Sequence, residues 1–329
     1  MTSIWCPNAI SSLDLQDYLV TDTEMTFTLL IPQVHHRHLK VRAILLLAAL
    51  WLTACNTVVE APSSNYGSRV NYLVLHATSE DFAESLRLLT QPTANPVSSH
   101  YLVPAPSDPS YTRSSLRVHR LVPELERAWH AGVSYWAEET GLNDRSIGIE
   151  IVNEFKCSGT SDPINETAPE DISCEFPSYD EKQIALVIEL ASDILARYPS
   201  INPIDVVAHS DIAILRKSDP GPEFPWKRLY EAGIGAWYEE DIKADYEQRF
   251  AQRLPEISTI QNALNRLGYR IEASGRFDSG TRYAMRAMQL HYRPQNYAGE
   301  IDAESAAIIW ALLEKYRPRE LEALLIADQ

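Results

Sequence analysis

The 329-residue sequence predicts an α/β fold, with a mixed central β-sheet flanked by helices, plus a small C-terminal three-helix domain. Two observations lead to this fold class. Between residues 66 and 245, short apolar runs typical of strands alternate with longer segments of helical period, which predicts a domain built around one sheet. From residue 250 to residue 329 only the helical period continues, which predicts a second, helical domain.

Four short segments of the first domain are predicted strands, at residues 70–75, 98–103, 147–152 and 206–208. In the third strand, isoleucines alternate with Gly148 and Glu150, so Glu150 lies on the face opposite the isoleucines. Because Gly148 has no side chain, we expect room for a ligand on that face. Glu150 is therefore expected in an exposed cleft rather than in the core.

Helical periodicity predicts three helices in the same domain. The first follows a cap at Thr78 or Ser79 and carries an apolar face. The second spans about residues 180–198 and stops at a proline. The third opens at Pro225 and ends at Gly233.

The second domain is expected to contain three short helices. The first ends at Gly268, the second starts at Thr281, and the third carries Ile308 and Leu312 on its apolar face. A bare three-helix bundle would show the same apolar spacing, so the helical period alone does not indicate a function.

Composition and charge exclude one class of partner. Hydrophobic residues make up 45% of the chain, which is typical of a globular protein, and the formal net charge is −16. A nucleic-acid-binding protein needs a basic face to neutralise phosphates, and this sequence does not supply one. We therefore expect no nucleic-acid partner.

The segment at residues 39–55 has the pattern of a secretion signal. An apolar run at residues 43–52 follows Lys40 and Arg42, and it is far shorter than the ~20 apolar residues that span a bilayer. The string Leu-Thr-Ala-Cys that ends at Cys55 is similar to a bacterial lipobox, which implies cleavage before Cys55 and lipid attachment to its sulfur. A buried apolar strand is the alternative.

A lipobox implies a bacterial lipoprotein. Asn56 after the cysteine favours transport to the outer membrane, which implies the periplasmic face of the outer membrane of a Gram-negative bacterium. The acyl chains would anchor the protein to that membrane, with residues 56–65 as a linker. Residues 1–38 precede the signal, and we hypothesise that they are a mis-called extension, with translation starting at position 39. A metal-binding histidine tract at residues 35–38 is the alternative reading of that segment.

Two further cysteines are Cys157 and Cys174, which lie just before and within a polar, acidic insertion loop at residues 158–177. In an oxidising compartment such a pair predicts a disulfide that pins the loop. A reactive nucleophile is the alternative for either thiol.

Residues able to bind a metal occur at two separate places. His209 and Asp219 flank Lys217 in the string VVAHSDIAILRKSDPGP, and His76 stands at the end of the predicted strand RVNYLVLHAT. Two imidazoles, one carboxylate and an open position for water make a catalytic rather than a structural zinc site. This set suggests hydrolysis. Ordinary polar roles for the histidines, and a turn-stabilising role for Asp219, are the alternatives.

This ordered set, with the strings VSSHYLV, RAWHAGVSYW and LNDRSIGIEIVN, resembles the zinc-dependent N-acetylmuramoyl-L-alanine amidases, whose superfamily also contains peptidoglycan recognition proteins. The AmiD-like lipoprotein branch is the most similar. The resemblance covers residues 66–245, and residues 256–315 resemble the small peptidoglycan-binding domain of wall hydrolases. The amidase resemblance implies the zinc amidase fold, Zn²⁺ as cofactor, and peptidoglycan or muropeptides as partners.

The resemblance also implies a reaction: hydrolysis of the lactyl–L-alanine amide between N-acetylmuramic or 1,6-anhydro-N-acetylmuramic acid and the stem peptide. Glu150 is the candidate general base and acid, and Lys217 would stabilise the oxyanion; a solvated carboxylate and a surface lysine are the alternatives. His100 and His130 fit a substrate wall, a place behind the ligands, or the core. The functional rival is a non-catalytic peptidoglycan-binding receptor, but such receptors lose metal ligands and this sequence keeps three.

Overall fold

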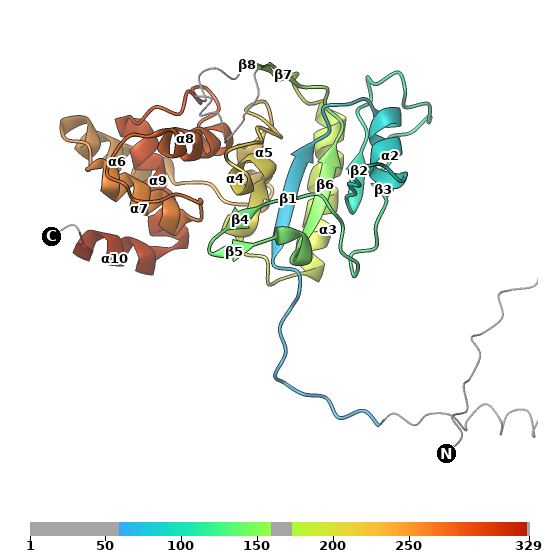
Figure 1. The fold of residues 1–329 in the computed structure, drawn as a ribbon, viewed down its shortest axis with the longest axis horizontal. Helices are drawn as coiled ribbons and strands as arrows, with labels where there is room; N and C mark the ends of the chain where they lie inside the picture. The colour runs from blue at the N-terminus through green and yellow to red at the C-terminus, as the bar shows by residue number, and fades with distance from the viewer. Residues whose placement is uncertain (1–58, 159–172, 328–329) are drawn as a thin grey trace, which may run out of the picture. The chain divides into compact units, whose positions relative to one another are not determined.

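The computed structural model describes residues 59–158 and 173–327 (Figure 1). The predictions for residues 1–38, for the signal peptide and for Cys55 concern residues outside these ranges. Tyr66–Gln329 is one compact unit, separate from Met1–Asn65. In the part that the structure describes, no helix has the length and apolar character to cross a membrane.

A five-stranded mixed sheet lies at the centre of this unit, in the order β3-β2-β6-β1-β9. Strands β2, β6, β1 and β9 run parallel, and β3 pairs antiparallel with β2 at the edge. The parallel strands are almost wholly buried, as expected for a sheet covered on both faces. The strands are β1 (Tyr72–Ala77), β2 (Tyr101–Val103), β3 (His119–Arg120), β6 (Ser146–Ile151) and β9 (Val206–Ala208). The predicted mixed sheet is therefore confirmed.

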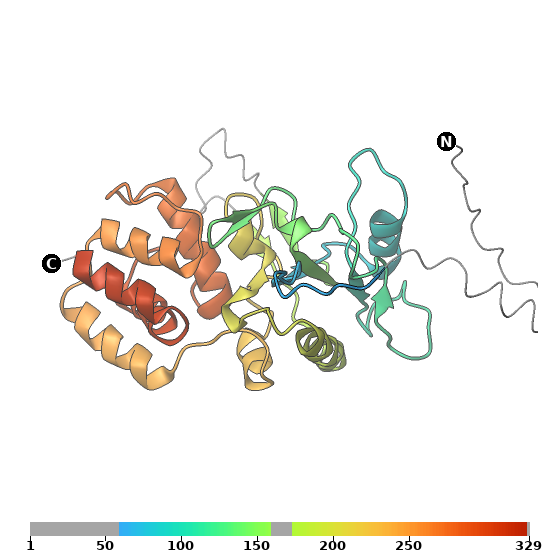
Figure 2. The same cartoon turned by 90° about the horizontal axis from the view of Figure 1, so that it is seen from below.

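Helices pack around the sheet. Helix α3 (Glu181–Arg197), predicted at 180–198, lies across one face (Figure 2), and its N-cap Asp180 accepts a hydrogen bond from the backbone N–H of Lys182. The predicted cap of α2 (Phe82–Thr90) at Thr78 or Ser79 is wrong. Asp81 caps this helix by accepting a hydrogen bond from Glu84 N–H at 2.8 Å.

Shorter elements complete this part of the molecule. They are the helices α4 (His209–Ile212) and α5 (Trp226–Glu231), the 3₁₀ turns Leu142–Asp144 and Pro203–Asp205, the hairpin of β4 (Tyr135–Trp136) and β5 (Glu139–Thr140), and the hairpin of β7 (Lys156–Ser158) and β8 (Ser173–Glu175). A disulfide joins Cys157 to Cys174 across β7 and β8 with an S–S distance of 1.99 Å. Most of the loop expected between these cysteines, residues 159–172, lies outside the described residues.

The C-terminal helices gather at one end of the unit, and α2 lies at the opposite end (Figures 1 and 2). They are α6 (Glu240–Gln252), α7 (Ile257–Leu267), α8 (Ser279–Tyr292), α9 (Ala303–Tyr316) and α10 (Pro318–Ala327). Three helices were expected, and they correspond to α7, α8 and α9. The structure contains one further helix in this region, α10. Helix α6 packs on α9 and crosses the expected domain boundary at 245–250. We call residues 240–327 the helical part and residues 66–239 the sheet part.

The apolar core continues from the sheet part into the helical part. Trp136 of β4 is buried against Tyr269, with ring centroids 5.0 Å apart in an edge-to-face arrangement. Gly268, the C-cap of α7, has a φ of 140° and faces the Trp136 ring so closely that a Cβ would lie 2.6 Å from it. A glycine is therefore required at this contact, both for its backbone conformation and for space.

Candidate active site

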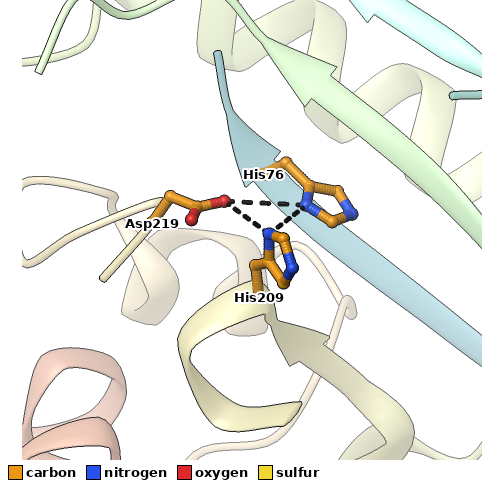
Figure 3. A group of neighbouring side chains, drawn as sticks. All are labelled: His76, His209 and Asp219. Carbon is orange, nitrogen blue, oxygen red and sulfur yellow. Dashed lines mark hydrogen bonds and ion pairs between the residues drawn. The ribbon is translucent and has the colours of Figure 1, made fainter. Parts of the chain in front are cut away.

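Three side chains from separate elements converge at the carboxyl ends of β1 and β9 (Figure 3). His76 lies near the end of β1, His209 begins α4 directly after β9, and Asp219 lies in the following loop. The Nδ1 atoms of the two histidines are 2.9 Å apart, and Asp219 Oδ2 lies 3.1 Å from Nδ1 of His209 and 3.6 Å from Nδ1 of His76. All three side chains are buried. The structure thus brings together the three residues that the sequence suggested as ligands.

This donor set fits a single metal ion. Ligand bonds of about 2.0–2.2 Å in a tetrahedral zinc site put neighbouring donor atoms roughly 3.3 Å apart, close to the separations found between these atoms. Burial lowers the pKa of His209 to about 3, so its imidazole is neutral, as metal ligation requires. Burial alone would raise the pKa of Asp219, but the two imidazoles that face it hold that pKa well below its ordinary value. The residues offer two neutral nitrogens and one carboxylate.

Glu150 stands beside this cluster because of strand register. In the parallel pair β1–β6, His76 lies directly opposite Glu150, and Glu150 Oε1 is 3.9 Å from His76 Nδ1. The Glu150 side chain is 13% exposed and lines a cleft of about 180 Å³ that His209 and Asp219 also line. Burial raises the pKa of Glu150 above its ordinary value. A carboxyl group with a raised pKa at a cleft wall suits proton transfer near neutral pH.

Lys217 lines the same cleft. Its positive charge lowers the pKa of both Glu150 and Asp219, so it acts electrostatically on the acid and on the ligand cluster. The side chain is partly buried, which strengthens its field over that of a fully exposed lysine. The cleft therefore combines an acid, a cation and the candidate metal ligands.

His130 supports the ligand His76 from behind. Its Nδ1 lies 2.9 Å from His76 Nε2, its Nε2 lies 3.1 Å from Ser146 Oγ, and Ser146 in turn donates to the carbonyl of Leu142 at 2.7 Å. The His130 ring also fills the space beside Gly148, where a Cβ would lie 2.5 Å from the ring. The expectation that this space holds a ligand is therefore wrong. His130 therefore lies behind the candidate ligand His76, and it also lines the cleft of Glu150, as expected for a substrate wall.

His100 has the ordinary role of a core histidine. It is fully buried, its Nδ1 accepts a hydrogen bond from Gly148 N–H at 3.0 Å, and its Nε2 lies 3.3 Å from the carbonyl of Glu126. Burial lowers the pKa of His100, so a neutral ring satisfies both contacts. His100 does not line the cleft.

Two residues near His209 were missed by sequence reasoning. Asp211, buried in α4, accepts hydrogen bonds from Ala208 N–H at 2.8 Å and from the Tyr269 hydroxyl at 2.8 Å, and it lies 2.7 Å from His291 Nδ1. Arg216 Nη2 donates to the carbonyl of Ala131 at 2.6 Å. The string HSDIA showed an acid near the histidine, but its partners lie in the helical part, so no local spacing could indicate them.

Comparison with known proteins agrees with this geometry. A family model described as N-acetylmuramoyl-L-alanine amidase matches residues 66–222, and one described as a putative peptidoglycan binding domain matches residues 253–308. The chain is 44% identical over 251 residues to N-acetylmuramoyl-L-alanine amidase AmiD of Escherichia coli K12, an alignment that covers 75% of this chain and 84% of that protein. A shorter match of 174 residues at 28% identity, covering 51% of this chain and 58% of the relative, is to a putative amidase of Rickettsia conorii.

Solved structures show the same similarity. AmpDh3 of Pseudomonas aeruginosa in complex with anhydromuramic pentapeptide superposes with a TM-score of 0.71 at 45% identity, over 79% of this chain and 98% of that one. AmiD of E. coli in complex with anhydro-N-acetylmuramic acid-L-Ala-D-γ-Glu-L-Lys superposes with a TM-score of 0.65 at 41% identity, over 78% and 93% of the two chains. Both alignments extend beyond the sheet part alone.

Proposed function

The chain belongs to the N-acetylmuramoyl-L-alanine amidase family, and from this membership we propose a zinc-dependent mechanism for its hydrolysis of peptidoglycan amides. The protein is an enzyme of that class, and the bond it cleaves is the lactyl–L-alanine amide between N-acetylmuramic or 1,6-anhydro-N-acetylmuramic acid and the stem peptide. The observation that carries the mechanism is the convergence of His76, His209 and Asp219 beside Glu150. The rival reading, a receptor without activity, is not supported, because the ligand set is complete.

His76, His209 and Asp219 would hold the zinc ion. Zinc in such a site supplies Lewis-acid polarisation and lowers the pKa of water towards ~7, so hydroxide chemistry becomes accessible at neutral pH. Because two imidazoles and one carboxylate leave a tetrahedral ion one free position, the site has the ligand count of catalytic rather than structural zinc.

Glu150 is the proposed proton carrier. As a carboxylate it takes a proton from the attacking water, and as a carboxylic acid it returns that proton to the departing nitrogen of L-alanine. The raised pKa favours the first step, because a more basic carboxylate takes a proton from water more readily, and the protonated group is still acidic enough to give that proton to the more basic amine. Its position opposite His76 in the sheet fixes the distance between this acid and His76 without help from a loop.

Lys217 is proposed to stabilise the transition state. As the tetrahedral intermediate forms, negative charge grows on the former carbonyl oxygen, and a cation at the cleft wall stabilises that charge more than it stabilises the neutral amide. This difference lowers the barrier.

The proposed location of the protein rests on the lipobox in its sequence. Lipid attached to Cys55 would hold it at the periplasmic face of the outer membrane of a Gram-negative bacterium, where it meets peptidoglycan. Labelling with a radioactive fatty acid, in the wild type and in a Cys55→Ser variant, tests the anchor; unlabelled wild-type protein would contradict it.

The test of the mechanism is Glu150→Gln, with Glu154→Gln as a matched control. Glu154 is exposed and does not line the cleft. We expect Glu150→Gln to reduce kcat by about 10²–10⁴-fold, the usual contribution of a general acid–base group, while bound zinc stays unchanged. Glu154→Gln should retain full activity. Mass spectrometry of stem peptides released from sacculi and elemental analysis of the purified variants measure the two quantities. An active Glu150→Gln enzyme would exclude this role for Glu150.

A further inference from the structure

A second, larger groove lies between the sheet part and the helical part. Its volume is about 940 Å³, at the upper end of the range of ligand pockets. Residues 133–135 and 211–216 line one side, and residues between Asn265 and Gly280 line the other. It shares no lining residue with the cleft of Glu150, so it is a separate candidate site.

Three arginines line this groove: Arg216, Arg270 and Arg276. Among the described residues, none of their guanidinium groups lies within ion-pair distance of a carboxylate, whereas Arg266, Arg282 and Arg293 of the helical part are each paired in this way. The three arginines lie in one groove of a chain with a net charge of −16, and Arg216 also donates hydrogen bonds to the carbonyls of Ala131 and Val133. Their arrangement favours a ligand that carries carboxylates, since guanidinium binds carboxylate in a bidentate manner.

Three acids also line the groove, so the formal charge of its lining is zero, but contacts within the fold hold two of these acids. The carboxylate of Asp211 accepts hydrogen bonds from Ala208 N–H and from Tyr269, and the carboxylate of Asp278 caps α8 by accepting from Thr281 N–H at 2.9 Å. Both are therefore engaged within the fold. Glu272 is the remaining acid of the groove and is exposed.

The rest of the groove suits an extended peptide. Ile212, Ala213 and Ile214 supply a buried apolar surface, Val133 is 80% exposed and Leu215 is 40% exposed. Arg270 lies over the Tyr135 ring, with its guanidinium carbon 5.9 Å from the ring centroid. Apolar contact area between separated cations matches a short peptide with acidic groups along it, whereas a neutral glycan offers the arginines no charge to bind.

We propose that this groove binds a peptidoglycan stem peptide other than the one being cleaved. The stem named in the AmiD complex, L-Ala-D-γ-Glu-L-Lys, carries a free α-carboxylate on its glutamate, a terminal carboxylate and one amino group on lysine. Arg270 and Arg276 bind the carboxylates, and the acid of Glu272 suits the amino group. The proposal deepens the proposed function: a second stem held beside the cleft raises the effective concentration of polymeric substrate at the catalytic residues.

The test is charge reversal of two groove arginines, Arg270→Glu with Arg276→Glu, in the full-length protein. The matched control is Arg249→Glu with Arg319→Glu, two exposed arginines of the helical part that do not line the groove. Arg216 is left in place because its guanidinium lies 3.4 Å from the ligand His209. Binding to intact sacculi is measured by sedimentation with Glu150→Gln added to every variant, so that the sacculi survive. Turnover of the small substrate anhydro-N-acetylmuramic acid-L-Ala-D-γ-Glu-L-Lys is measured without that substitution.

We expect the groove variant to bind sacculi about tenfold more weakly, since two charge-assisted contacts are lost, while kcat/KM for the small substrate stays unchanged. The control variant should bind sacculi as the wild type does. Free L-Ala-D-γ-Glu-L-Lys should compete with sacculi for the protein that carries Glu150→Gln alone, and glycan strands stripped of peptide should not.

Equal sacculus binding by the groove variant and the wild type would overturn the proposal, as would an equal loss in the control, which would indicate general charge repulsion. Competition by stripped glycan alone would overturn the identity of the ligand. Failure of the proposed function gives a different result, because neither the wild type nor any variant would then turn over the small substrate, while the sedimentation result would still decide whether the groove binds the stem peptide.

Discussion

His130 fixes the orientation of the candidate metal ligand His76 through its own proton. If His76 binds metal through Nδ1, its Nε2 carries a hydrogen and donates to His130 Nδ1, 2.9 Å away. His130 must then carry its proton on Nε2, where Ser146 Oγ accepts it, and Ser146 donates onward to the carbonyl of Leu142. Only one arrangement of protons satisfies this series of hydrogen bonds. The series therefore holds His76 in the tautomer that leaves Nδ1 free.

Two substitutions at His130 separate this effect from simple packing. Asparagine can place its amide oxygen near the position of Nδ1 and keep the acceptor for His76, whereas glutamine places its polar end near Nε2 and loses it. We expect His130→Gln to weaken zinc binding by about 10–100-fold and His130→Asn to restore much of that affinity. Competition with a chromogenic chelator measures it. A matched change at His119, which is remote from the ligands, should have no effect; equal affinities for the two His130 variants would contradict the tautomer argument.

The sequence was sufficient for the three candidate ligands but not for the residues behind them. Imidazoles and a carboxylate at the ends of predicted strands can be recognised because parallel strands end at the same edge of a sheet. His130 and Ser146 contact one another only through the way the loop before β4 folds over Gly148, and no periodicity encodes that contact. For the same reason, Gly148 suggested an open space that His130 in fact fills.

At the scale of elements, the last turn of α3 is tied to the loop before β4. Arg197 Nη2 lies 2.6 Å from Glu124 Oε1, and the hydroxyl of Tyr101 in β2 donates to the same oxygen at 2.6 Å. Burial raises the pKa of Glu124, but the hydrogen bonds from Arg197 and Tyr101 outweigh it, and the pKa lies below its ordinary value of 4.5. The carboxylate form is thus favoured in the folded protein.

Glu124→Gln should therefore change the pH dependence of stability. A carboxyl group whose pKa is lower in the folded state stabilises the protein above the unfolded pKa, and this stabilisation is lost as the pH falls through the folded pKa. We expect the variant to lose about 1 kcal/mol in the free energy of unfolding near neutral pH, a value discounted because Arg197 is 39% exposed. The loss should shrink at pH values below 4.5. Urea unfolding at several pH values measures it, with the exposed Glu126→Gln as control; a loss independent of pH would contradict the assignment.

Element positions followed from sequence where local signals were strong. Helix α3 and strands β6 and β9 lie within one residue of their predicted ends at most boundaries, because apolar period and capping residues agree there. The first helix was assigned the wrong cap because Thr78, Ser79 and Asp81 are all capping residues, and only the path of the chain decides among them. Ser79 has a φ of 60°, so the chain is still turning at that residue.

At the scale of the whole molecule, the sheet part and the helical part share buried polar contacts as well as a core. Asp211 follows the ligand His209 by two residues, and its carboxylate is held by Tyr269 and faces His291 of α8. Trp226 stacks on the His291 ring at a centroid distance of 3.7 Å. A helical part attached in this way does more than carry a wall-binding surface, since it also fixes the short helix that begins with a metal ligand.

Tyr269→Phe should weaken the contact between Tyr269 and Asp211, which joins the two parts of the molecule and holds helix α4 in place. The substitution leaves the packing against Trp136 but removes a hydrogen bond to a buried carboxylate, which costs about 1.5–3 kcal/mol in the free energy of unfolding. We expect one cooperative unfolding transition at a lower temperature, seen equally by tryptophan fluorescence and by far-ultraviolet circular dichroism. Tyr297→Phe serves as a control for loss of a hydroxyl elsewhere in the helical part. Two separate transitions in the wild type would contradict the coupling of the two parts.

Removal of residues 253–329 tests the same coupling at its limit. The deletion exposes the buried side chains of Trp136 in β4 and Ile212 in α4, and it removes Tyr269 and His291, the partners of the Asp211 carboxylate. If the helical part were only a wall-binding module, the remaining sheet part would keep its stability and its zinc affinity and lose only binding to sacculi. We expect instead that the truncated protein unfolds at a lower temperature and binds zinc more weakly, because helix α4 loses the contacts that hold His209. Thermal unfolding and chelator competition, each compared with the intact protein, measure these changes; a truncated protein equal to the intact one in both would show that the active site is independent of the helices beside it.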